Sequence, residues 1–120
     1  MQNFKALKVW QKAHRLTLDI YKATKTFPKD EMYGLISQMR RSSASIAANI
    51  AEGCGKNGDV ELARYLQIAM GSASELEYHI LLSHDLNFLG LLDYEQIEKK
   101  VSEVKKMLTG FIKTLRDESC

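Results

Sequence analysis

The 120-residue sequence contains one proline and two cysteines, Cys54 and Cys120. With so little proline, and with the glycines clustered only at positions 53–58, a fold of many strands and tight turns is excluded and long helices are favoured. The cysteine spacing fits neither a zinc site nor a disulfide framework, so we expect reduced thiols. No hydrophobic run is long enough to span a membrane, and the charged N-terminus has no signal-peptide core. We therefore expect a soluble, cytoplasmic protein without membrane contact.

The composition that is present is that of a folded protein. Hydrophobic residues make up 45% and charged residues 27% of the chain, which excludes disorder as the default state. A chain of this length accommodates one domain, and we expect that domain to span residues 1–120.

Four segments show the apolar spacing of three and four residues that marks one face of a helix: residues 4–26, 31–52, 59–86 and a last segment starting at 93. Pro28 ends the first segment. Asp30, then Asn57 or Asp59, and finally Asp93 are the expected N-caps, and Gly53 is expected to end the second segment in a left-handed conformation. The sequence predicts an all-α fold, an antiparallel up-down-up-down four-helix bundle.

The second segment is unusually lean. Residues 40–53 read RRSSASIAANIAEG, and one stripe of this helix is made of alanines alone. Such a stripe predicts close contact with another helix or another subunit, since exposed faces usually carry longer side chains; good surface helix formers are the alternative. Gly71 in the third segment would lie opposite if the two helices are antiparallel. The residues assigned to helix or subunit packing are Ala44, Ala48, Ala51 and Gly71.

The net charge of +2 is unevenly distributed. Residues 1–29 hold seven Lys or Arg residues and a single acidic residue, Asp19. The last segment adds three lysines at steps of seven, Lys99, Lys106 and Lys113. Repeated round an oligomer, these cations would attract phosphates, whereas the alternative is an ordinary solvated helix face. The candidate nucleic-acid-binding residues share one face of the first segment: Lys5, Lys8, Lys12, Arg15 and Lys22.

Arg40 and Arg41 lie in mid-helix beside apolar positions, where an unpaired charge is costly. Antiparallel packing would bring Glu75 or Glu77 close to them, so we expect at least one of these arginines to form a structural ion pair. Contact with a phosphate or a partner is the functional alternative.

The sequence predicts no enzyme, no cofactor and no metal site. A di-iron bundle needs Glu-x-x-His motifs, and none occurs here. Cys54 has no evident activating partner, and the three histidines, His14, His79 and His84, have the character of surface or packing residues. Trp10 and Tyr21 are likewise expected to pack rather than to stack on bases.

Several motifs together resemble a known family. They are Trp10-Gln11-x-Ala13, Phe27-Pro28-x-x-Glu31-x-Tyr33-Gly34-Leu35, Gln38-x-Arg40-Arg41, Ser45-Ile46-x-x-Asn49-Ile50-Ala51-Glu52-Gly53, and Ala69-x-Gly71-Ser72 followed by Glu75-Leu76-Glu77. Over nearly its whole length the chain resembles the four-helix bundle proteins encoded by intervening sequences in bacterial large-subunit ribosomal RNA genes, which are sometimes classed with ribosomal proteins. That family is similar in fold to the accessory variability determinant of diversity-generating retroelements, a pentamer that binds reverse transcriptase and nucleic acid.

The resemblance implies a homopentamer of bundles and a link to nucleic acid, but no reaction. Two functions follow. One is an oligomeric scaffold that associates with RNA, or with an enzyme acting on nucleic acid, through a basic surface. The other is a structural or protein-interaction oligomer that never contacts nucleic acid.

Overall fold

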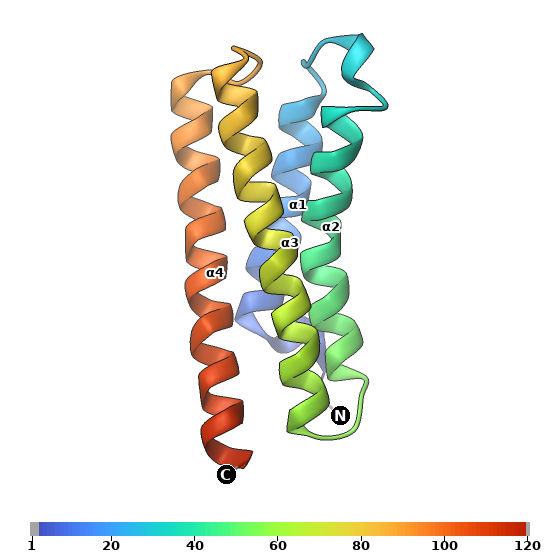
Figure 1. The fold of residues 1–120 in the computed structure, drawn as a ribbon, viewed down its shortest axis with the longest axis vertical. Coiled ribbons are helices and arrows are strands. Elements are labelled where there is room, and N and C mark those ends of the chain that lie inside the picture. Colours follow the sequence, from blue (N-terminus) through green and yellow to red (C-terminus); the bar gives the residue numbers. More distant parts are fainter. Residues whose placement is uncertain (1–2, 120) are drawn as a thin grey trace.

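A computed structural model describes residues 3–119, and four long helices dominate it (Figure 1). They are α1 (Lys8–Thr24), α2 (Leu35–Cys54), α3 (Asp59–Asp85) and α4 (Leu91–Ser119). Two short 3₁₀ helices, η1 (Phe4–Ala6) and η2 (Lys29–Glu31), precede α1 and α2. The described residues include no strand, so the predicted all-α class is confirmed.

The helices form an elongated bundle of 47 × 22 × 20 Å. In Figure 1 the α1–α2 and α3–α4 connections lie at the upper end, and the α2–α3 loop and both termini lie at the lower end. Arg41 of α2 pairs with Glu75 of α3, and one turn later Ser45 hydrogen-bonds Ser72 at 2.9 Å, so α3 runs back along α2. Each long helix packs against two neighbours, and within the described part of the chain no diagonal pair is in contact.

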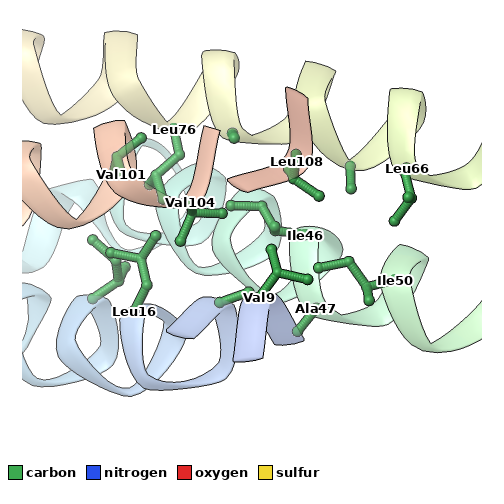
Figure 2. Close-up of a cluster of buried hydrophobic side chains, with 14 of the residues drawn as sticks. Val9, Leu16, Ile46, Ala47, Ile50, Leu66, Leu76, Val101, Val104 and Leu108 are labelled. Atoms are coloured by element: carbon green, nitrogen blue, oxygen red, sulfur yellow. The ribbon is translucent and has the colours of Figure 1, made fainter. Parts of the chain in front are cut away.

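All four helices contribute to one hydrophobic core (Figure 2). The inward positions are those that the three-four spacing predicts, and Leu16, Ile46, Leu76 and Leu108 are each fully buried. Burying one such aliphatic side chain contributes about 1.5–3 kcal/mol, so this shared core is the main source of stability. The core also fixes the rotation of each helix, and therefore which side chains face the solvent.

The helix starts differ from those predicted. The 3₁₀ turn η2 follows Pro28, so Asp30 caps no long helix and α2 begins only at Leu35. The carboxylate of Glu31 accepts the N–H of Leu35 at 3.0 Å and supplies the missing cap. Gly58 rather than Asn57 or Asp59 precedes α3, and α4 begins at Leu91, two residues before Asp93.

Gly53 does not end α2, so the predicted left-handed stop is wrong. The helix continues through Gly53 to Cys54, and positive φ angles occur instead at Gly58 (88°) and Asn87 (63°). A Cβ on Gly53 would lie 2.8 Å from Cβ of Tyr65 and 3.0 Å from Cδ1 of Leu62. Glycine is therefore required because α2 and α3 approach closely there, and not because of its backbone conformation.

Candidate nucleic-acid interface

The predicted basic stripe lies on the exposed side of α1. Lys8, Lys12, Arg15 and Lys22 are all exposed, because the inward face of α1 is occupied by Val9, Ala13, Leu16 and Ile20. Lys5 precedes them in η1, with its Nζ atom 6.0 Å from the centre of the Phe4 ring. The periodicity thus places these cations where a ligand could reach them.

Neighbouring carboxylates neutralise part of this stripe. Nζ of Lys12 lies 3.1 Å from Oε1 of Glu103 on α4, and Nζ of Lys100 on α4 lies 2.6 Å from Oδ2 of Asp19. These contacts cross between α1 and α4 and show that the two helices are antiparallel. Sequence reasoning missed both pairs, although Asp19 had been noted as an interruption. Exposed pairs of this kind stabilise a fold by about 0–1 kcal/mol each.

The remaining cations of α1 form what we call the α1 row: Lys8, Arg15 and Lys22. Within residues 3–118 none of them has an ion-pair partner. Steps of seven residues keep them on nearly the same side of the helix, since seven residues are close to two full turns. Their charge is therefore available to an external anion.

A second set of cations, the α4 row, lies on the adjacent helix: Lys99, Lys106 and Lys113. All three are exposed and also follow steps of seven. They too have no ion-pair partner within the described residues. Because α1 packs directly against α4, the two rows belong to one basic face of the bundle.

Arg41 pairs with Glu75 of α3 and also donates to Oε1 of Gln38 at 2.9 Å. Glu77 instead accepts from Nζ of Lys105 on α4 at 2.9 Å, which links α3 to α4. These two ion pairs join neighbouring helices inside the subunit.

Arg40 pairs with neither Glu75 nor Glu77. Its Nε atom donates to Oγ1 of the buried Thr24 at 3.0 Å, and its guanidinium lies 4.7 Å from the centre of the Tyr21 ring. Arg40 therefore joins α2 to α1 and has a structural environment without any carboxylate. No signal in the sequence pointed to Thr24 as its partner.

The lean residues of α2 and α3 have different surroundings. Ala44 and Ala51 are half-buried and Ala48 is exposed. Ser45 and Ser72 form the small contact between α2 and α3. Gly71 is exposed, and a Cβ there would meet no atom within 4 Å, so packing inside the subunit does not require glycine at this position.

The histidines and Cys54 lie away from the basic face. His14 stacks on Trp10 with 5.0 Å between ring centres, and Nδ1 of His84 lies 3.0 Å from the carbonyl oxygen of Leu89. Burial lowers the pKa of His79, and its Nδ1 atom is buried without a hydrogen-bond partner. Burial raises the pKa of the Cys54 thiol, which keeps it protonated and poorly nucleophilic.

Neither a metal cluster nor a membrane span emerges from the geometry. Within the described part of the chain, no three His, Cys, Asp or Glu side chains come together as ligands. The helices described here are also too polar or too short to cross a bilayer.

The family is identified by comparison with known proteins. The family model described as 23S rRNA-intervening sequence protein matches residues 5–110. The chain belongs to this family. No curated protein matches the chain significantly. The family resemblance seen in the sequence motifs is therefore confirmed.

A solved structure supports the same conclusion for the fold. The chain is similar to the crystal structure of a protein of unknown function from the S23 ribosomal protein family of Bacteroides thetaiotaomicron. The two are 27% identical, the match covers 88% of this chain and 95% of that chain, and the TM-score is 0.81. Neither description assigns a reaction to these intervening-sequence proteins.

Proposed function

We propose that this intervening-sequence protein is a non-enzymatic, homo-oligomeric scaffold that associates with RNA in the cytoplasm through the basic face of α1 and α4. The observation that carries the proposal is the concentration of exposed, unpaired cations in the α1 and α4 rows. Its family, named for ribosomal RNA, favours RNA as the polyanion. The reduced state expected for the buried Cys54 suits a cytoplasmic location.

The physical basis of the association is the release of counterions from the phosphate backbone. Each phosphate neutralised by Lys or Arg contributes about −0.9 to the slope of log affinity against log salt on a duplex, or about −0.7 on a single strand. Contacts of this kind carry little sequence information, because they are made to phosphates and not to base edges. Binding should therefore be strongly salt-dependent and weakly sequence-selective.

The test compares wild-type protein with a variant in which the α1 row is reversed. The variant carries Lys8→Glu, Arg15→Glu and Lys22→Glu, and both proteins are titrated into a labelled structured RNA while light scattering reports assembly. We expect binding to fall by at least about tenfold, at about 1–3 kcal/mol per lost contact, with the oligomer intact. Unchanged affinity in a well-folded variant would overturn the proposal.

The homo-oligomeric part of the proposal is supported by the lean surface of α2 and α3. Ala48 and Gly71 are both exposed on helices that pack against each other, so a neighbouring subunit could approach closely there. Five subunits are implied by the family resemblance. Ala48→Glu should lower the mass measured by light scattering, whereas Ser74→Glu, an equal change at another exposed position, should not. Equal masses for both variants would exclude this face as the contact.

A protein-interaction oligomer that makes no contact with nucleic acid is the second candidate. It is favoured by three exposed leucines at one end of the bundle, with Leu86 46%, Leu91 61% and Leu92 69% exposed. Apolar groups gathered in this way are typical of protein contacts. The reversal of the α1 row separates the two functions, because it should leave a protein-interaction function unchanged.

A further inference from the structure

The unpaired cations of the basic face are divided into two parallel lines. Within each row, successive side chains are seven residues apart, which corresponds to about 10.5 Å along a helix. The contacts Lys12–Glu103 and Asp19–Lys100 fix the antiparallel alignment of α1 and α4. The α1 and α4 rows therefore run side by side along the length of the bundle, in opposite sequence directions.

The strip between the two rows carries paired charge. Lys12 and Lys100, the cations nearest the junction of the helices, are held by Glu103 and Asp19 at 3.1 and 2.6 Å. Their fields are largely cancelled at short range, whereas the cations of the two rows have no such partners. The positive potential is thus concentrated along two lines separated by a more neutral seam.

This arrangement suits two phosphate strands better than one. Helix axes in a bundle lie about 8–10 Å apart, and outward-pointing lysines spread the rows further. An extended single strand laid along one row would leave the other row without phosphates. A double helix presents two backbones flanking a groove, and double-stranded RNA is recognised mainly through shape, phosphates and 2′-hydroxyls across its shallow minor groove.

The basic face also has no exposed aromatic side chain of the kind that single-strand binding uses. Proteins that hold single strands stack bases on aromatic side chains, at about 1–3 kcal/mol per base. The exposed aromatic residues are Tyr21, Tyr33 and Tyr78. Tyr21 is covered by Arg40, Tyr33 lies in the connection before α2, and Tyr78 is on α3. Phe111 of α4 is only half-exposed and packs against the core.

From these observations, and resting on the RNA-binding function proposed above, we propose that the protein binds double-helical RNA, with the α1 row on one phosphate strand and the α4 row on the other. The neutral seam then faces the groove between the strands. If all six cations engage, the salt slope on a duplex is about −5, against about −2 for a single strand on one row.

The test titrates a short RNA duplex and each of its separated strands against four proteins. Besides wild type, one variant reverses part of the α1 row (Arg15→Glu, Lys22→Glu) and one reverses part of the α4 row (Lys106→Glu, Lys113→Glu). The matched control, Lys29→Glu with Lys56→Glu, makes the same change in net charge at exposed loop positions outside both rows. If a reversal impairs folding, the corresponding Gln variants ask the same question while keeping a good helix former.

We expect the duplex to bind at least about tenfold more tightly than either strand. Each row variant should weaken duplex binding by at least about tenfold beyond the control and reduce the magnitude of the salt slope by about two. Strands that bind as tightly as the duplex, or a duplex sensitive to only one row, would overturn this inference while leaving RNA binding in place. Absence of binding to any RNA at low salt would overturn the proposed function as well.

Discussion

Gly53→Ala should destabilise the protein, although alanine is the better helix former. The substitution places a methyl group 2.8 Å from Cβ of Tyr65 and 3.0 Å from Cδ1 of Leu62. Cβ of Tyr65 is close to the α3 backbone and cannot move aside by a simple change of rotamer. Relieving such overpacking typically costs about 1–3 kcal/mol, whereas the gain in helix propensity is about 1 kcal/mol. The balance is a net loss of about 1 kcal/mol.

Gly110→Ala is the matched control for this prediction. Gly110 also lies inside a long helix, but it is exposed and a Cβ there would meet no atom within 4 Å. Only the propensity gain remains, so this variant should be more stable than wild type by about 1 kcal/mol. The two glycine-to-alanine changes are therefore expected to have opposite signs and to differ by about 2 kcal/mol.

Urea unfolding followed by circular dichroism measures both effects at one fixed protein concentration, because any assembly makes apparent stability depend on concentration. A difference of 2 kcal/mol corresponds to roughly 8 °C in melting temperature for a chain of this size. Equal stabilisation by both alanines would show that α2 and α3 do not approach closely at Gly53, and would refute the reasoning.

Three further predictions address side chains that the structure places unexpectedly. Arg40→Ala removes the bond to buried Thr24 and the contact with Tyr21, so the free energy of unfolding should fall by about 1–2 kcal/mol; an unchanged urea midpoint would contradict this. For His79, burial lowers the pKa below the ordinary 6.5, with Arg41 lowering it and Glu75 raising it. The unfolded chain then binds the proton first, so stability should fall as pH drops below about 6.5, and His79→Gln should flatten that fall; an identical pH profile for the variant would argue against it. In a Cys120→Ser background, the buried Cys54 should react slowly with a thiol reagent in the native state and fully in urea, and fast native labelling would show that α2 opens near its end.

The helices could be predicted from the sequence because apolar spacing reports directly on burial. Leu16, Ile46, Leu76 and Leu108 were assigned to inward faces from periodicity alone, and all are fully buried. The helix ends were harder, since several residues competed as caps. Asp30 has the better capping chemistry, but the turn after Pro28 places the carboxylate of Glu31 at the start of α2.

Gly53 shows a different limit of sequence reasoning. A glycine near the end of a helical pattern usually indicates a left-handed stop. Here its function is to admit the neighbouring helix, which depends on the distance between α2 and α3. That distance is a property of the packed bundle, and no local pattern reports it.

The candidate interface was predictable in part for the same reason. The exposed position of the α1 and α4 cations follows from the apolar faces of their helices. Which of them are neutralised depends on how α1 and α4 are aligned and rotated against each other. The pairs Lys12–Glu103 and Asp19–Lys100 therefore became visible only in the folded structure, as did the bond between Arg40 and Thr24.

The most direct test of the central claim is the affinity of the wild-type protein for a structured RNA, measured across about 50 to 200 mM salt. Because the account assigns binding to exposed cations without ion-pair partners, it predicts a complex at low salt whose log affinity falls linearly with log salt and weakens by orders of magnitude over this range. No complex at the lowest salt, or an affinity independent of salt, would contradict the account and leave the α1 and α4 rows as a solvated surface.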